Sequence, residues 1–128
     1  MNHALISLAA NDEKKETTIA HALRLIESYC VILNQTPVYR SEAAGESQQP
    51  SYANALLQVE TDQEYEELRR RFKSLEHDAG RTPASKERGI IPLDIDIISW
   101  NETLLKNKDM EYDYMKKGLH LLAENNNS

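Results

Sequence analysis

Two aspartates, Asp94 and Asp96, stand one residue apart inside an otherwise aliphatic stretch that spans residues 93–98. Side chains alternate faces along a strand, so both carboxylates are expected on one face, with their α-carbons about 6.6 Å apart. Carboxylates at this spacing can reach one divalent cation, and Mg²⁺ combines such ligands with the phosphate oxygens of a substrate. Burial without a cation or a basic partner would be unfavourable. A strand whose aspartates simply face water fits the same pattern, so both interpretations stand at this point.

The elements around this pair follow the order strand, helix, strand, strand, helix, strand. Strands are predicted over residues 3–10, 31–41 and 53–61, and the fourth carries the aspartates. Each of the two helices is predicted from an apolar stripe at helical spacing. The stripes are Ile19, Leu23, Ile26 and Cys30, and then Tyr65, Leu68, Phe72 and Leu75.

Capping and breaker residues set the predicted boundaries. Asn11 and Asp12 are expected to cap the first helix and Asp62 the second. Pro37 makes the second strand an edge strand or a bulged one. The remaining segments are predicted as loops over 42–51 and 78–89, a helix over 112–124 and a fraying tail over 125–128.

This order is that of the split βαβ, ferredoxin-like α+β fold, in which two helices cover one face of an antiparallel sheet. Leu93, Ile95 and Ile97 are needed under the helices. Asp94 and Asp96 are therefore expected on the opposite, open face, where loops at one end of the sheet can add further ligand-binding groups.

Composition narrows the classes of function. A length of 128 residues suits one domain, and a net charge of −6 disfavours general nucleic-acid binding, which needs a basic surface. No apolar run approaches the roughly 20 residues of a membrane-spanning helix, and residues 1–10 do not resemble a secretory signal. The single cysteine, Cys30, excludes an internal disulfide. We therefore expect a cytoplasmic protein with neither nucleic-acid nor membrane partners.

Several short motifs, taken in their order, resemble those of the 6-hydroxymethyl-7,8-dihydropterin pyrophosphokinase family of folate biosynthesis. They are Gln49–Ala55, Val59–Thr61, Glu66–Leu68, Leu75–Glu76, Gly80–Arg81 and Leu93–Ile97. The resemblance implies a ferredoxin-like pyrophosphokinase domain over residues 1–124, followed by a disordered tail over 125–128. It also implies transfer of pyrophosphate from ATP to the hydroxymethyl group of a reduced pterin, with two Mg²⁺ ions.

The resemblance assigns roles to individual residues of this chain. Asp94 and Asp96 would bind both metal ions and, with Arg81, form the catalytic set. The pterin would be held by Asn54, Tyr52, Ser41 and Ala44. The nucleotide would be contacted by Glu76, Arg81, Arg88, Ile97, Tyr112 and Lys117.

The chain also departs from the family pattern at positions that bind substrate. Ile91 stands in place of a phosphate-binding arginine, and Leu119 in place of an aromatic residue that packs on the pterin. Losing a guanidinium from a polyphosphate site removes a strong contact. The other departures are Arg88 for an aromatic residue, Pro83 for an arginine, Glu111 for a histidine, Leu8–Asn11 for a Gly-Ser-Asn motif, and an end about one strand and one helix earlier.

Three hypotheses follow from these matches and departures. The first is an active pyrophosphokinase of reduced efficiency, a monomer or a weak dimer, with small-molecule pterin and ATP as its substrates. The second is a degenerate family member that binds nucleotide, pterin or a partner without turnover. The third is a ferredoxin-like interaction domain whose aspartates are solvated or paired with arginine.

Overall fold

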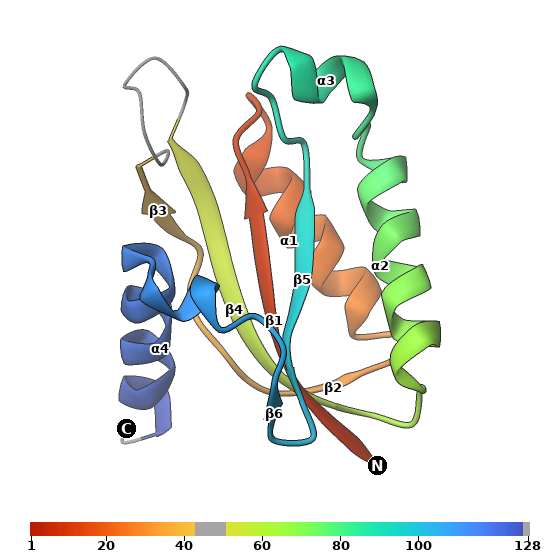
Figure 1. The fold of residues 1–128 in the computed structure, drawn as a ribbon, viewed down its shortest axis with the longest axis vertical. Coiled ribbons are helices and arrows are strands. Elements are labelled where there is room, and N and C mark those ends of the chain that lie inside the picture. Colours follow the sequence, from red (N-terminus) through yellow and green to blue (C-terminus); the bar gives the residue numbers. More distant parts are fainter. Residues whose placement is uncertain (43–50, 127–128) are drawn as a thin grey trace.

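An antiparallel six-stranded sheet organises the residues that the computed structural model describes, 1–42 and 51–126 (Figure 1). The strand order is β2-β4-β1-β5-β6, and β3 also pairs with β4. The strands are β1 (Asn2–Ala10), β2 (Val31–Gln35), β3 (Tyr39–Ser41), β4 (Tyr52–Thr61), β5 (Asp94–Trp100) and β6 (Thr103–Leu104). The helices are α1 (Lys15–Ile26), α2 (Tyr65–Asp78), α3 (Pro83–Glu87), the 3-10 helix η1 (Lys108–Glu111) and α4 (Asp113–Asn126).

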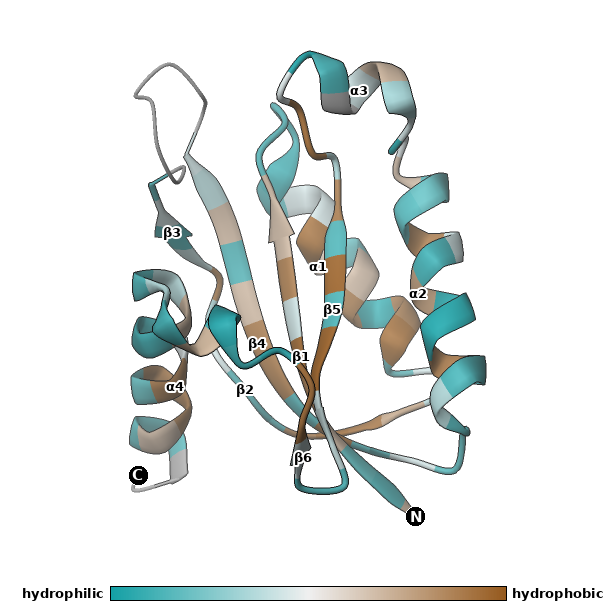
Figure 2. Cartoon of the chain, viewed as in Figure 1, coloured by the Kyte–Doolittle hydropathy of each residue, from teal (hydrophilic) through white to brown (hydrophobic). Residues whose placement is uncertain are grey.

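Helices α1 and α2 cover one face of the sheet and form the main core with it. Ile6, Leu57 and Ile95 are buried in one cluster with Ile26 of α1 and Phe72 of α2. Burial of a side chain of this size contributes about 1.5–3 kcal/mol, so this layer accounts for much of the stability. Hydrophobic residues line the inner sides of both helices, whereas the outer side of α2 is hydrophilic (Figure 2). The predicted ferredoxin-like α+β fold is confirmed.

The other face of the sheet is partly covered by α4, which packs on β2, β3 and β4. Leu56 and Ile98 of the sheet are buried there with Met115 and Leu122 of the helix. The close approach depends on Gly118, because a Cβ there would collide with side-chain atoms of Leu56 and with the hydroxyl of Tyr39. This face is therefore only partly open, and the prediction of an open face holds for the part over β1 and β5.

Several predicted boundaries differ from the structure. Asp62 does not cap α2, since Glu64 is its N-cap and forms a capping box with Glu67. Asn11 and Asp12 do not cap α1, whose N-cap is Lys14. The strand predicted over 31–41 is divided into β2 and β3 on either side of Pro37, and the loop predicted over 78–89 contains α3. The short β6 and η1 were not predicted. The helix predicted over 112–124 is α4.

None of the helices within the described residues is both long enough and apolar enough to cross a membrane.

Candidate active site

Two cross-strand rows of side chains define the site, which lies on the face of the sheet that α4 partly covers. In the first row, Ala9 of β1 pairs with Asn54 of β4 on one side and with Asp94 of β5 on the other. In the next row, Ser7 lies between Leu56 and Asp96. Neighbouring strands are about 4.8 Å apart, so Asn54 and Asp94 face each other across roughly 10 Å with only a methyl group between them. Strand pairing thus brings the predicted pterin residue and the predicted metal residue together.

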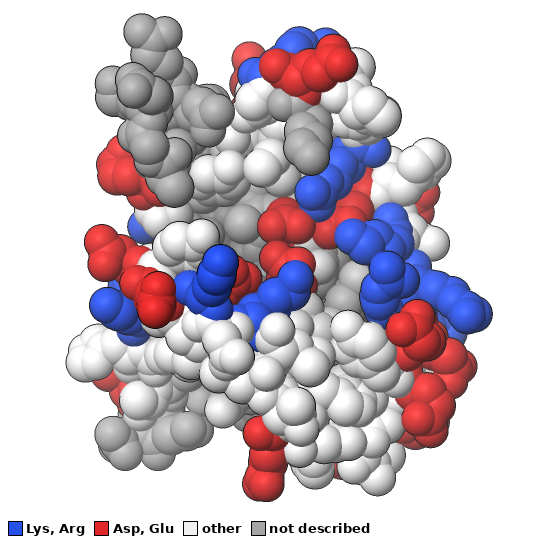
Figure 3. Space-filling model, viewed as in Figure 1, with Lys and Arg blue, Asp and Glu red and all other residues white. Residues whose placement is uncertain are grey.

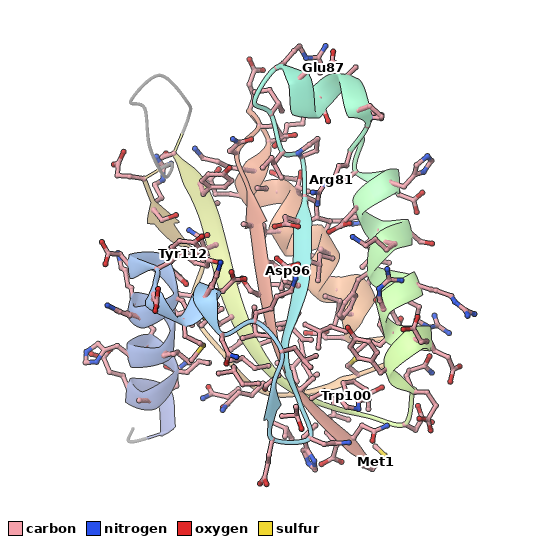
Figure 4. The ribbon with its side chains drawn as sticks, in the orientation of Figure 1. Met1, Arg81, Glu87, Asp96, Trp100 and Tyr112 are labelled. Carbon is pink, nitrogen blue, oxygen red and sulfur yellow. The ribbon has the colours of Figure 1, made fainter. Side chains whose placement is uncertain are left out.

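The two aspartates lie on the same face and interact with each other. Burial, followed by the negative charge of Asp94 and a side-chain hydrogen bond with it, raises the pKa of Asp96 to about 6, and Lys106 opposes this rise. Figure 4 shows Asp96 on the near face of β5, with Arg81 above it. Acidic atoms lie at the middle of this face, with basic side chains on both sides of them (Figure 3). The pair therefore needs positive charge nearby and can accept a cation.

Glu76 and Arg81 fix the outer edge of β5 beside this pair. Because β6 pairs only with the far end of β5, the backbone N–H of Ile95 has no strand partner and donates instead to Glu76 Oε2 at 2.8 Å. Arg81 Nη1 donates to the same Glu76 oxygen at 3.1 Å and to Asp94 Oδ1 at 2.8 Å. Lys73 Nζ lies 3.3 Å from Glu76 Oε1. The buried carboxylate of Glu76 thus holds Arg81 against Asp94.

A cleft of about 480 Å³ opens between the first row and the start of α4. Asn54 forms part of its wall and donates its side-chain amide to Ser41 Oγ at 2.8 Å and to the Tyr39 carbonyl at 3.3 Å. Burial raises the pKa of the Tyr52 hydroxyl, and the negative charge of the nearby Asp94 raises it further. The lining residues are Ala9, Ser41, Glu42, Tyr52, Asn54, Ile91, Asp94, Tyr112, Asp113 and Tyr114.

The structure brings together most of the residues predicted for the site. Ser41, Tyr52, Asn54, Asp94 and Tyr112 line the cleft. The residues placed beside it are Asp96, Arg81 and Glu76, in contact with Asp94 directly or through Arg81.

The remaining predicted residues lie elsewhere. The side chain of Ile97 is buried in the core on the opposite face of β5, and Arg88 is exposed beyond α3. Lys117 is exposed on α4, with its ammonium 5.7 Å from the centre of the Tyr39 ring. Ala44 lies outside the described residues. Leu119 packs against the Leu56 cluster and does not line the cleft.

The sequence did not single out Tyr114 or Asn11 as part of the site. Tyr114 lines the cleft, and its position directly after Tyr112 and Asp113 at a helix start was the available signal. Asn11 is buried and accepts from the Ile91 N–H at 2.6 Å while donating to the Gly89 carbonyl at 3.1 Å. Its own N–H donates to the Ile91 carbonyl at 2.9 Å. Asn11 therefore fixes the segment that leads into β5.

Residues 5–124 match the 7,8-dihydro-6-hydroxymethylpterin-pyrophosphokinase (HPPK) family. The chain belongs to this family. The folic acid synthesis protein FOL1 of Dictyostelium discoideum is 28% identical over 110 residues, which cover 86% of this chain and 17% of that protein. The folate synthesis bifunctional protein of Arabidopsis thaliana is 27% identical over 99 residues, which cover 77% of this chain and 20% of that protein. The chain thus spans about a fifth of the length of these relatives.

Proposed function

We propose that this HPPK-family chain transfers pyrophosphate from ATP to the hydroxymethyl group of 6-hydroxymethyl-7,8-dihydropterin in folate biosynthesis. The observation that carries the proposal is the row Asn54–Ala9–Asp94, which lines a cleft of about 480 Å³ and ends at one carboxylate of the aspartate pair. Family membership and the folate-synthesis names of its relatives support the same reaction.

The residues present suit Mg²⁺, the cation expected with ATP. Among the described residues no cluster of three or more His, Cys, Asp or Glu side chains could hold a metal, so Asp94 and Asp96 would be its protein ligands and phosphate oxygens would complete the shell. The fit is electrostatic, because the raised pKa of Asp96 reflects, after burial, repulsion from Asp94 that a cation would relieve. When bound, one or two such ions would neutralise the polyphosphate and favour attack of the hydroxyl oxygen on phosphorus, with AMP as the leaving group.

The chain's own contribution is to position both substrates. Asn54 and Ser41 offer polar groups to the edge of a pterin, Tyr52 packs beside it, and Ala44 lies in the segment that follows Ser41. A ring held there directs its hydroxymethyl group towards Asp94. Alignment of the hydroxyl oxygen with the phosphorus atom supplies much of the rate enhancement in such reactions.

Arg81 is the cation best placed to bind the transferred group. Its guanidinium bridges Glu76 and Asp94, so it can remain on Glu76 while it turns its other N–H groups towards phosphate oxygens. Glu76, predicted as a nucleotide contact, would act by holding Arg81. Of the remaining predicted nucleotide residues, Tyr112 lines the cleft and would contact the nucleotide there. Arg88 and Lys117 would have to reach the nucleotide from exposed positions outside the cleft, and Ile97 could contact it only through its backbone.

The test is an assay for AMP formed from ATP, Mg²⁺ and the hydroxymethyl-dihydropterin. We expect AMP at a rate that depends on all three components. Asp94→Asn should remove it, whereas Glu124→Gln, on the exposed outer side of α4, should not. Absence of pterin-dependent AMP from folded protein at millimolar substrates would refute the proposed activity.

A second candidate function, binding without turnover, is favoured by one observation. Ile91 lines the cleft at the position where the family pattern has an arginine, and none of the described lining residues is basic. This alternative predicts that both substrates bind with Mg²⁺ in calorimetry while no AMP forms. Restoration of turnover by Ile91→Arg would support it and would identify the missing group.

A further inference from the structure

Tyr114 lines the cleft, and its backbone is hydrogen-bonded to the sheet side of the cleft. It lies in the first turn of α4, and its carbonyl accepts a hydrogen bond from the Tyr39 hydroxyl at 2.7 Å. One turn further on, the contact of Gly118 with Leu56 sets how close α4 lies to the sheet. The backbone that carries the Tyr114 ring is therefore anchored to both β3 and β4.

The hydroxyl of Tyr114 lies close to the sheet. Burial raises the pKa of this hydroxyl, and the nearby side chain of Ser7, the residue between Leu56 and Asp96 in the second cross-strand row, lowers it. The ring therefore extends from α4 across the face of the sheet towards the aspartates. A ring on an anchored backbone offers a flat apolar surface at little entropic cost to a ligand that stacks on it.

The ring of Tyr112 stacks on the ring of Tyr114 at the start of α4. The Tyr112 ring lies nearly parallel to that of Tyr114, with centroids 5.9 Å apart and an angle of 22° between the planes. Tyr112 is about half exposed (49%), so its ring lies at the mouth of the cleft while Tyr114 lies deeper. Tyr52 lines the same cleft and is also close to Asp94. The cleft thus presents three aromatic side chains and no basic one among its described lining residues.

We propose that Tyr114 is a substrate-binding residue whose ring stacks on the heterocycle of the pterin. This inference rests on the proposed function and adds a residue to it. The stack would place the heterocycle between α4 and the row Asn54–Ala9–Asp94, with its polar edge towards Asn54. Aromatic stacking of a nucleobase-like ring changes affinity by about 10-fold to 100-fold.

The experiment measures pterin affinity by fluorescence titration and kinetics by AMP formation in three variants. Tyr114→Leu should raise the pterin Kd and KM by about 10-fold to 100-fold while kcat and the ATP affinity change little. Tyr114→Phe keeps the ring and should stay within about 3-fold of wild type. Tyr65→Leu is the matched control, because Tyr65 packs on Trp100 away from the cleft, and it should leave the pterin Kd unchanged.

The outcomes separate this inference from the proposed function. A wild-type protein that neither binds the pterin nor forms AMP refutes both. A wild-type protein that does so, with Tyr114→Leu equally effective, refutes the role of Tyr114 alone. An equal loss in Tyr114→Phe and Tyr114→Leu would assign the effect to the hydroxyl and overturn the stacking role. If Tyr114→Leu does not fold, Tyr114→Met, whose flexible side chain can refill the space, carries the same expectation.

Discussion

The two faces of β5 differ in what their side chains contribute. Towards α1 and α2, Ile95 and Ile97 are buried in an apolar core. Towards the cleft, Asp94 and Asp96 are half-buried, with an arginine on one and a raised pKa on the other. The same seven-residue strand therefore stabilises the fold on one face and gathers charge on the other. This separation is possible because consecutive side chains of a strand point to opposite faces of the sheet.

The side chains on the two faces of β5 also have opposite effects on the stability of the folded chain. On the core face each native side chain stabilises the folded chain, so any truncation lowers stability. On the cleft face the native carboxylates repel each other, and Asp96 is harder to ionise in the folded chain than in the unfolded one. Groups of this kind are retained for ligand binding at some expense in stability. The comparison predicts opposite responses to substitution on the two faces.

The largest expected effect is on catalysis, from Asp96→Asn. We expect kcat/KM for AMP formation to fall at least about 1000-fold, equivalent to about 4 kcal/mol, because the amide is a poor Mg²⁺ ligand. The same substitution should raise the melting temperature at pH 8, since the repulsion of Asp94 is removed. A destabilised Asp96→Asn protein would contradict the opposition between the two faces.

The next effect is on stability, from Ile95→Ala on the same strand. Ile95 is 4% exposed, and truncation of such a side chain lowers the free energy of unfolding by about 3 kcal/mol. Ile95→Val should lower it by about 1 kcal/mol. Denaturant unfolding measures both changes. The AMP rate per folded molecule should stay near that of wild type. A loss of rate without a loss of stability would contradict the assignment of stability to the core face of β5 and of catalysis to the cleft face.

Much of this arrangement was predictable from the sequence, because the alternation of Ile95 and Asp96 and the two helical stripes are local patterns. Capping was predicted less well, since Asn11 had a long-range partner at Ile91 that no local pattern reveals. Tyr114 was missed although it directly follows Tyr112 and Asp113, because its place in the cleft depends on α4 packing across the sheet onto Tyr39. The assignment of two metal ions and of substrate contacts stays a prediction.

A third prediction concerns α4, which packs on the sheet through Met115 and Leu122 and lines the cleft through Asp113 and Tyr114. Gly118→Ala places a methyl group against Leu56 and the Tyr39 hydroxyl, so α4 must shift away from the sheet. We expect a loss of about 2 kcal/mol in unfolding free energy and a rise in pterin KM, because Tyr112 and Tyr114 move with the helix. Mg²⁺–ATP affinity should change little. Lys116→Ala, on the exposed side of the same helix, is the control.

The smallest expected effect is the pH dependence of stability that comes from Asp96. Its pKa is raised from 3.8 to about 6 on folding, so the folded chain binds more protons than the unfolded chain between these values. Stability from this group is therefore present below about pH 4 and is lost as the pH rises to about 6. For a pKa raised by about two units, proton linkage changes the free energy of unfolding by about 3 kcal/mol. Solvent screening of the partly exposed Asp96 reduces this change to about 1 kcal/mol.

The difference between wild type and Asp96→Asn isolates this contribution from the other carboxylates. Urea unfolding is measured for both proteins at pH 4.5 and pH 7.5, which bracket most of this transition. Relative to wild type, the free energy of unfolding of Asp96→Asn should be about 1 kcal/mol higher at pH 7.5 than at pH 4.5. Added Mg²⁺ should reduce the gap, because a cation bound to wild type favours the ionised carboxylate. An unchanged gap with Mg²⁺ would mean that the acidic face of β5 is neutralised by Arg81 and Lys106 alone, which is the arrangement expected of a non-catalytic domain.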